Sequence, residues 1–531
     1  MYKVLYKWEE WFHNRNMDSS SQLVLVDLPE EPVPPKAPIA KVKLNTVNRQ
    51  QIMLAPIYVE ELIPADHKAR AIWELAGRLD LSRFCAGLRS AAGCPGRPAW
   101  DPQLLVSLWV YAYSEGISSA REIQRLMEWE PGMQWLGGLE TVNHHTLSDF
   151  RVDHQEALEK LFAELLVTLE NAGLLSLEQV MHDGTKIRTQ AGADSFRREK
   201  TARQRLAEVR EALRQMGDPR ADAAPRDRKQ VARERAALER NELLEAALKE
   251  IAGLQVALDS EEDKAKVRVS LSEPEARLMK HGDNAIAPSY NAQISTEAKH
   301  KLIIGAHLSQ SSSDAQSLTA AMDEVIKNLE KKPEQVVVDG GFTNRDNIVE
   351  CAVQQIDLVG SLPDPKERSA AAMKALGIDP QFAPSEFRIL DDGKGLECPA
   401  GCRLKPLRTN RKRGDLYQQY QARGADCAVC PEQPRCCPKK PKRGRTVSIR
   451  LEERAEVAAF RKKMETIEYR EIYRKRGAVA EFPNAWIKDK LGLRKFRVRG
   501  LMKAGSELLW ACLTYNIMQW VRIVWRQEAK A

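Results

Sequence analysis

Two short hydrophobic segments, far apart in the chain, each run directly into an aspartate that is followed by a glycine. The first is QVMHD, residues 179–183, and the second is QVVVD, residues 335–339. A β-branched run such as the second predicts a buried parallel strand. Because ligands of open α/β sheets bind beyond the carboxyl ends of the strands, we expect Asp183 and Asp339 at a functional edge of such a sheet.

The segments around these strands alternate between strand and helix patterns. Residues 290–296 and 302–308 have strand patterns, and residues 314–330 have the amphipathic period of a helix. A further helix and strand follow, as far as residue 360. This order predicts an α/β fold in which Asp183 ends the first strand and Gly184 begins a turn.

Other patterns divide the rest of the 531 residues. Pro102 after Asp101, and Ser118 with Ser119, are start signals for two helices in a helical region near the N-terminus. The expected parts are a tail with a proline-rich linker (1–53), an all-α domain (54–173), the α/β core (174–194 and 268–362), a charged helical, coiled-coil insertion (195–267), a basic cysteine-rich insertion (363–450) and a helical C-terminal segment that closes the core (451–531).

Neither end of the chain has a membrane or secretion pattern. The N-terminal MYKVLYKWEEWF lacks a basic-then-apolar order. The apolar stretch 508–525 contains Asn516, Gln519 and Arg522, which favours a buried amphipathic helix over a membrane span. Ten cysteines without a secretion signal indicate a reducing compartment, so we expect a cytoplasmic protein.

Positive charge is concentrated in two places rather than spread over the chain. The net charge is +8, and residues 403–450 alone hold fourteen Lys and Arg against three acidic residues. A second basic run covers residues 488–503. Local basic density of this kind suits a polyanionic substrate, and a solvated charged face is the alternative interpretation.

Asp183 and Asp339 have a specific chemistry if the fold brings them together. Carboxylates are hard oxygen ligands that can share Mg²⁺ ions. Two such ions can activate an attacking hydroxyl and stabilise the leaving oxygen of a phosphoryl transfer. The alternative is ordinary turn chemistry, because Asp-Gly is a common turn pair.

A third acidic residue follows near the C-terminus in the sequence YRKRGAVAEFPNAWIK. Tyr473, Arg476, Glu481 and Lys488 have the spacing Y-x2-R-x4-E-x6-K. On a helix, Glu481 and Lys488 lie on one face, which would carry a metal ligand and cations for phosphates. The alternative is an ordinary charged helix with both side chains exposed.

In this combination the chain resembles the DDE transposases of bacterial insertion sequences, in the group with a Y-R-E-K signature. DGTKI at Asp183, VVVDGGFTN around Asp339 and the helix with Glu481 match in order and spacing. GRPAWDPQLLVSLWVYAYSEGISSAREI and HHTLSDFRVDHQEAL resemble the helical DNA-binding domain that precedes the core in this family. The resemblance covers residues from about 63 to 522.

The resemblance implies an RNase H-like catalytic core with Asp183 on its first strand and Asp339 on its fourth. It also implies two Mg²⁺ or Mn²⁺ ions held by Asp183, Asp339 and Glu481, with Tyr473, Arg476 and Lys488 positioning DNA or the helix. The implied reaction is a nick at each element end, followed by attack of the 3′ hydroxyl on target DNA. The partners would be double-stranded DNA of the terminal inverted repeats and of the target, bound by at least a dimer at the nucleoid.

Six cysteines cluster within the basic insertion. Cys398-x3-Cys402 lies upstream, and Cys427-x2-Cys430 is followed by Cys436 and Cys437. Cys398, Cys402 and Cys427, with Cys430 or Cys436, are expected as ligands of a structural Zn²⁺ in a knuckle-like arrangement. Free reduced thiols in a flexible basic loop are the alternative, because Cys-x3-Cys is an imperfect spacing.

Three functions fit these patterns. The first is an active transposase that cuts and joins DNA. The second is a catalytically idle DNA-binding descendant of one, which would not need all three acids. The third is a stand-alone metal-dependent nuclease with an RNase H-like fold, which would cut without joining.

Overall fold

The computed structural model describes residues 50, 56–86, 98–216, 227–362, 372–390, 395–412, 415–438 and 443–528. The expected tail and linker, residues 1–53, lie outside the described residues apart from Gln50.

The N-terminal part is helical, as its sequence predicts. Its second helix begins at Pro102, and the Asp101 side chain accepts a hydrogen bond of 2.8 Å from the backbone N–H of Gln103. The next helix is capped by Ser119, so the predicted start signals at both positions are confirmed. The helices are α1 (Lys68–Ala76), α2 (Pro102–Ser114), α3 (Ala120–Leu126), α4 (Pro131–Gly137), α5 (His144–Asp153) and α6 (Gln155–Asn171).

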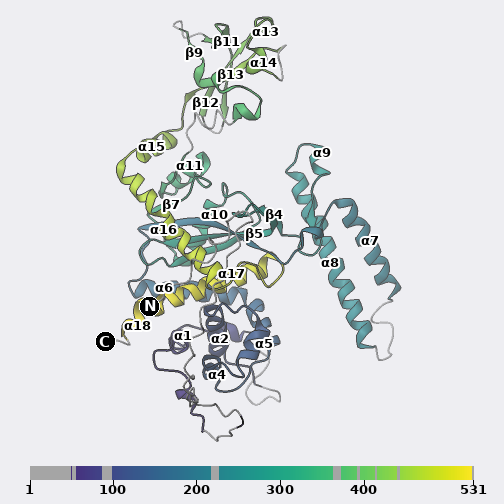
Figure 1. Cartoon of the computed structure of the whole chain (residues 1–531), viewed down its shortest axis with the longest axis vertical. Helices are drawn as coiled ribbons and strands as arrows, with labels where there is room; N and C mark the ends of the chain where they lie inside the picture. The colour runs from purple at the N-terminus through teal and green to yellow at the C-terminus, as the bar shows by residue number, and fades with distance from the viewer. Residues whose placement is uncertain are drawn as a thin grey trace, which may run out of the picture. The chain divides into compact units, whose positions relative to one another are not determined.

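A six-stranded mixed sheet follows (Figure 1). Its order is β4-β5-β1-β7-β8. The β4 strand pairs with residues 286–289 of β5, and β6 pairs with residues 291–296 of the same strand. The β5 strand is antiparallel to β1 and β6, whereas β7 is parallel to β1 and β8 is parallel to β7. The strands are β1 (Gln179–Arg188), β4 (Arg277–Lys280), β5 (Ile286–Glu297), β6 (Ile303–Ser309), β7 (Gln335–Val337) and β8 (Asp357–Val359).

The prediction that Asp183 ends its strand is wrong. β1 continues through Asp183 and Gly184 to Arg188, and it pairs with β5 over nine residues. Gly184 lies opposite Gln293 in this ladder, so it is strand backbone and not a turn. The partner strand β5 supplies hydrogen bonds to these residues, which overrides the local turn preference of Asp-Gly.

Helix α17 (Leu501–Trp520) is buried on almost every side, so the predicted burial is confirmed, whereas the predicted amphipathic character is wrong. It contacts the N-terminal helices and β6. Its Asn516 side chain accepts a hydrogen bond from the backbone N–H of Ile303 at 2.9 Å and donates one to the Ile303 carbonyl at 2.7 Å. The Asn516 side chain therefore satisfies both backbone hydrogen-bonding groups of Ile303, the first residue of β6. Within the described residues, no helix is both long and apolar enough to span a membrane.

The charged insertion contains two long helices that pack against each other, α7 (Glu199–Gln215) and α8 (Arg228–Val256). At their base β2 (Phe196–Arg197) pairs with β3 (Val269–Ser270). A small apolar cluster of Ala202, Ala247, Ile251 and Val269 lies at the same end.

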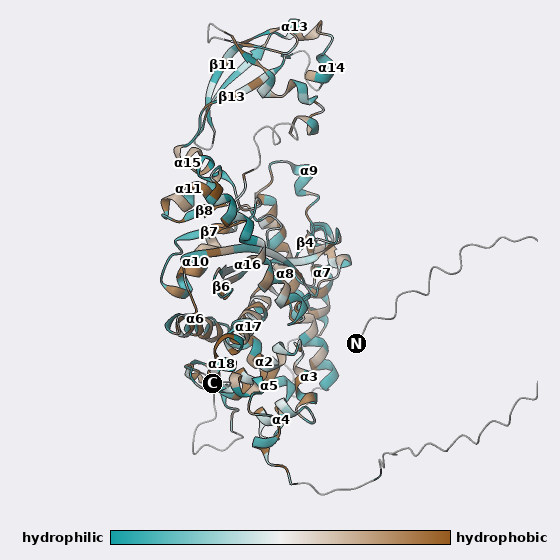
Figure 2. Ribbon diagram, turned by 60° about the vertical axis from the view of Figure 1, so that its left-hand side comes forward, coloured by the Kyte–Doolittle hydropathy of each residue, from teal (hydrophilic) through white to brown (hydrophobic). Residues whose placement is uncertain are grey.

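The cysteine-rich insertion contains a second, five-stranded sheet in the order β13-β12-β11-β10-β9. Most residues of its strand β11 are hydrophilic (Figure 2). The side chains of most of them are exposed. Its elements are β9 (Arg388–Ile389), β10 (Leu396–Glu397), β11 (Arg403–Lys412), β12 (Asp415–Ala422), α13 (Gly424–Ala428), α14 (Gln433–Cys436) and β13 (Thr446–Glu452).

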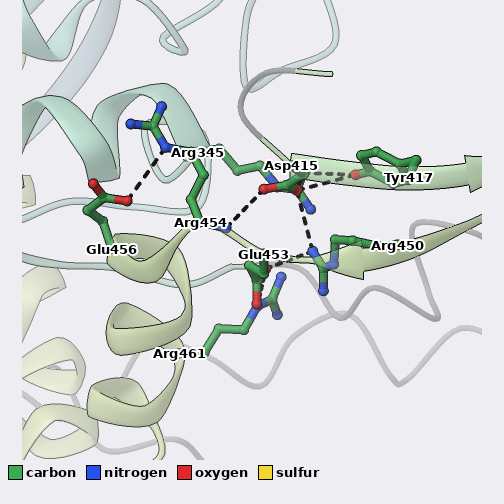
Figure 3. Close-up of polar contacts among 8 residues, drawn as sticks. All are labelled: Arg345, Asp415, Tyr417, Arg450, Glu453, Arg454, Glu456 and Arg461. Carbon is green, nitrogen blue, oxygen red and sulfur yellow. Dashed lines mark hydrogen bonds and ion pairs between the residues drawn. The ribbon is translucent and has the colours of Figure 1, made fainter. Parts of the chain in front are cut away.

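One buried carboxylate joins this second sheet to the helices beside it (Figure 3). Asp415 has no exposed surface, and it forms an ion pair with Arg345 at the start of α11 (Arg345–Val353). Tyr417 donates a hydrogen bond of 3.3 Å to Asp415. The backbone N–H of Arg454, just before α15 (Ala455–Met464), donates another of 3.1 Å. Arg450 lies 3.8 Å from the same carboxylate.

Replacing Asp415 with alanine should loosen this connection. The change removes the carboxylate that the half-buried Arg345, the Tyr417 hydroxyl and the Arg454 backbone N–H all contact, and the loss of these hydrogen bonds costs about 3 kcal/mol. We therefore expect tryptic cleavage within residues 403–450 to accelerate by about a hundredfold. The matched control is Asp426→Ala at an exposed position of α13, which should cleave at the wild-type rate. Equal cleavage of the two variants would contradict a structural role for Asp415.

Candidate active site

Asp183 lies in the middle of the sheet, half-buried on β1. Burial is the largest cause that raises the pKa of Asp183 to about 6, with smaller contributions from the carboxylates of Asp339 and Asp314, whereas Arg476 opposes the shift. A buried carboxylate is costly to ionise, so a cation beside Asp183 would stabilise its charged form.

Asp339 follows β7 by two residues, at the carboxyl end of the parallel strand next to β1. Its Oδ1 accepts hydrogen bonds from the backbone N–H groups of Gly341 at 2.7 Å and Phe342 at 3.3 Å. The Thr343 hydroxyl donates to the Asp339 carbonyl at 2.8 Å. This turn fixes one carboxylate oxygen of Asp339, and the charge of Asp339 is close enough to Asp183 to raise the pKa of that residue.

A third aspartate, Asp314, lies near Asp339 and next to Gly184 of β1, and was missed by the sequence analysis. It belongs to the connection between β6 and α10 (Leu318–Leu329). Its Oδ1 lies 2.6 Å from the position that a Cβ on Gly184 would take, and its Oδ2 lies 3.8 Å from the equivalent position on Gly341. Asp339 Oδ1 lies 3.0 Å from that second position. The two glycines therefore leave room for the carboxylates to approach.

Two buried amides of β5 hold Asp314. Asn291 Nδ2 donates to Asp314 Oδ1 at 2.7 Å, and Gln293 Nε2 donates to the same oxygen at 3.1 Å. Gln293 in turn contacts His182 Nε2 through its Oε1 at 3.0 Å, and His182 Nδ1 contacts the Ser295 hydroxyl at 2.9 Å. His182 is fully buried, so the structural role expected from strand alternation agrees with these contacts.

Helix α16 (Ile467–Asp489) packs across β1, β5, β7 and β8. Its Val479 and Ala480 form a buried cluster with Met181, Val337 and Val359 from the neighbouring strands β1, β7 and β8. Tyr473 packs on the same cluster. This packing fixes the face of α16 that is turned toward the acidic residues.

The two predicted cations of α16 act on Asp183. Arg476 favours the charged form of the Asp183 carboxylate. Lys488 is partly buried, which lowers its pKa, while the charge of Asp183 opposes that shift. Arg476 lies about one and a half helical turns before Glu481, and Lys488 lies two turns after it. Both place positive charge near Asp183.

Glu481 is exposed, and its Oε1 lies 3.3 Å from the Cβ position of Gly477, one turn earlier in the helix. The residue of α16 that contacts Asp183 is Asn484, whose Nδ2 donates to Asp183 Oδ2 at 3.1 Å. Across the contacts of the described residues, none joins the Glu481 carboxylate to Asp183 or Asp339. The sequence motif could not distinguish these neighbouring positions of one helix.

The donor atoms around Asp183 fit a hard divalent cation in their chemistry. They are carboxylate oxygens together with one buried amide oxygen, Asn484 Oδ1, which makes no hydrogen bond within the described part of the chain and belongs to the residue that contacts Asp183. Mg²⁺ and Mn²⁺ prefer such oxygen ligands. Among the described residues, no group of three or more His, Cys, Asp or Glu side chains is already arranged to hold a metal ion.

The six clustered cysteines line one small pocket of about 20 Å³. Backbone N–H groups point at two of the sulfur atoms, from Cys402 to Cys398 Sγ at 3.2 Å and from Arg445 to Cys427 Sγ at 3.4 Å. Burial and the neighbouring Cys398 raise the pKa of Cys402 to about 11. The predicted cysteines are therefore brought together, and Cys437 joins them.

Replacing Gly184 with alanine should destabilise the protein by about 1–3 kcal/mol, because the new methyl group would overlap Asp314 Oδ1 and Gln293 Nε2. The control is Gly253→Ala on α8, where nothing lies within 4 Å of the added Cβ. That change should stabilise by about 0.5–1 kcal/mol through helix propensity. Urea unfolding of both variants measures the two signs, and an unchanged Gly184→Ala variant would contradict the close approach.

Comparison with known protein families finds one match in the N-terminal part of the chain and one in the C-terminal part. A Transposase DDE domain family matches residues 397–521, which include α16 and the cysteine pocket. A Transposase domain (DUF772) family matches residues 57–153. A comparison with curated proteins finds no match.

Among solved structures, the chain is similar to the piggyBac transposase in a synaptic complex with hairpin DNA, solved by cryo-EM. The identity is 8% and the TM-score is 0.22, over 87% of this chain and 81% of that chain, which is too weak a likeness to carry an argument. The two family matches lie on either side of Asp183 and Asp339, and both are to transposase domains. These two matches support a DDE transposase of the insertion-sequence type.

Proposed function

We propose that this transposase cuts and joins DNA by phosphoryl transfer with two divalent ions, held by Asp183, Asp339 and Glu481. The observation that carries the proposal is the approach of Asp183 and Asp339 on adjacent parallel strands of a sheet ordered β6-β5-β1-β7-β8. We take this sheet to be an RNase H-like catalytic core, with Asp183 on its first strand and Asp339 after its fourth.

Bound Mg²⁺ or Mn²⁺ would supply Lewis-acid chemistry for the attacking and leaving oxygens. The residues of the chain supply the setting for it. The backbone amides of Gly341 and Phe342 orient Asp339. Glu481 is on the same helix as Asn484, which contacts Asp183, and bringing its carboxylate to the site requires a movement of its side chain or of α16.

Arg476 and Lys488 would hold the phosphates of DNA beside these carboxylates. Both act electrostatically on Asp183, so a phosphate bound at that point would meet two positive charges. Tyr473 packs on the core cluster of α16 and would position the helix rather than the DNA. Exposed basic residues of β11, such as Lys405 and Arg408, would extend the contact with double-stranded DNA.

The partners in this proposal are the terminal inverted repeats of the element and the target DNA. Two ends must be brought together before joining, so the active form would be at least a dimer. No dimer contact is needed to form the acidic site described above, because Asp183, Asp339 and α16 come from one chain.

We expect Asp183→Asn, Asp339→Asn and Glu481→Gln each to reduce cleavage to background, because each removes a charged ligand while keeping the side-chain size. Binding to the element ends should remain within a few fold of wild type. The measurement is in vitro cleavage and joining with purified protein, Mg²⁺ and DNA carrying the ends that flank this gene. Full cleavage by any one variant would remove that residue from the mechanism.

The same assay distinguishes the other two functions. Binding to the ends without any cut, in both Mg²⁺ and Mn²⁺, would identify a catalytically idle DNA-binding descendant. Metal-dependent cuts without joined products, and without preference for the ends, would identify a stand-alone nuclease.

We also propose that the cysteine pocket binds one structural Zn²⁺, with ligands from Cys398, Cys402, Cys427 and either Cys430 or Cys436. The support is the gathering of all these thiols around one pocket and the two backbone amides that point at sulfur atoms. Such amides stabilise thiolate charge, which Zn²⁺ requires. Rotation of the thiols would complete the four-ligand shell.

Metal analysis of the purified full-length protein should find about one zinc per chain. The double variant Cys427→Ser/Cys430→Ser should lose it, because serine is a poor zinc ligand. Cys85→Ser is the control, since Cys85 lies outside the pocket and should leave the zinc content unchanged. Zinc-free wild-type protein, purified without chelator, would contradict this proposal.

A further inference from the structure

A pocket that the proposed function does not use lies beside the carboxyl end of β8. Its volume is about 320 Å³. Its lining comes from the residues that follow β8, from one face of α15 and from the first half of α16. All of these lining residues belong to the described part of the chain.

The pocket is next to the turn that carries Asp339. Ser361 lines the pocket, and its carbonyl oxygen lies 3.4 Å from the position that a Cβ on Gly340 would take. Arg470 also lines the pocket, and it precedes Arg476 on α16 by six residues, or about 9 Å along the helix axis. A DNA strand whose reacting phosphate lies at the acidic residues would therefore carry a neighbouring phosphate to this pocket.

Two arginines give the pocket its positive charge. Arg461 Nε donates to Glu453 Oε1 at 3.2 Å, which orients the side chain and leaves its terminal nitrogens for another acceptor. Arg470 is exposed, and its guanidinium makes no hydrogen bond or ion pair with another described residue. The exposed acid Glu465 lines the same pocket, so the two arginines outnumber it.

The chemistry of this lining suits a phosphate group. A guanidinium matches phosphate oxygens with two parallel hydrogen bonds. Ser361 and Tyr473 line the pocket as well, and their hydroxyl groups can donate to the same kind of oxygen. The lining thus combines two cations with neutral donors, which is the set that contacts the backbone of DNA.

We propose that this pocket binds a backbone phosphate of the DNA strand beside the cut, with Arg461 and Arg470 as its cations. The inference rests on the proposed function, in which the reacting phosphate lies at Asp183 and Asp339. It adds a second point of attachment, which sets the direction of the strand as it leaves the acidic residues, along α16 toward α15.

The test is binding of the full-length protein to DNA carrying the ends that flank this gene, measured by fluorescence anisotropy in EDTA over a range of salt concentrations. Each phosphate contact adds about 0.9 to the steepness with which log affinity falls against log salt. Arg470→Gln should therefore reduce that steepness by about 0.9 and weaken binding at least about threefold. Glu465→Gln should strengthen binding, because it removes the acid from the pocket. The matched control is Lys462→Gln, at an exposed position of α15 outside the pocket, which should keep the wild-type salt dependence.

A second measurement locates the phosphate. Uncharged methylphosphonate linkages are placed one at a time along each strand near the cut. At one position the linkage should weaken binding by the wild type and have no further effect on Arg470→Gln. If every position that weakens the wild type weakens Arg470→Gln equally, the pocket holds no backbone phosphate.

The outcomes separate this inference from the function on which it rests. If the wild type binds the ends and Arg470→Gln keeps the wild-type salt dependence, the inference fails and the proposed function stands. An equal loss in Lys462→Gln and Arg470→Gln would indicate general attraction to DNA and also overturn the inference. If the wild type does not bind the ends, both fail. Since EDTA removes the ions, a failure of the two-ion chemistry in the cleavage assay would leave these binding results unchanged.

Discussion

The pairing of β1 with β5 is the constraint on which the rest of the structure depends. It places Asp183 opposite Ile294 and Gly184 opposite Gln293. The strand that carries Asp183 therefore also carries the glycine that leaves room for a neighbouring carboxylate. The other edge of β1 receives β7, which leads to Asp339. A shift of this ladder by one residue would turn Asp183 to the opposite face of the sheet and separate it from both neighbours.

Charge at the site is balanced by groups that come from different parts of the chain. Three carboxylates lie on or beside the sheet, and their mutual repulsion is opposed by Arg476 and Lys488 from α16. The helix itself is fixed by its apolar face, through Val479 and Ala480 on the central strands. The packing of α16 thus determines where Arg476 and Lys488 lie relative to the carboxylates. A bound phosphate or metal ion would change the net charge of this group of side chains.

Much of the core could be predicted because its signals are local. The hydrophobic period and the capping residues predicted helices α2 and α3 and the strands before Asp339. The family resemblance is confirmed by the two transposase-domain matches. Gly184 could not be interpreted correctly, since a glycine that permits close approach looks the same as a turn glycine. Asp314 lies in a polar stretch, SSSDAQS, whose meaning depends on amides of β5 that only the folded sheet brings near.

The separation of the site residues along the chain has a consequence for synthesis. Asn484 and Asp183 are 301 residues apart, and α17, which satisfies the first residue of β6, comes later still. A nascent chain on the ribosome therefore carries its aspartates long before it carries the helix that faces them. A premature stop in the region that encodes α16 and α17 would release a product with Asp183 and Asp339 but without a finished core, so the assembled site appears only late in translation.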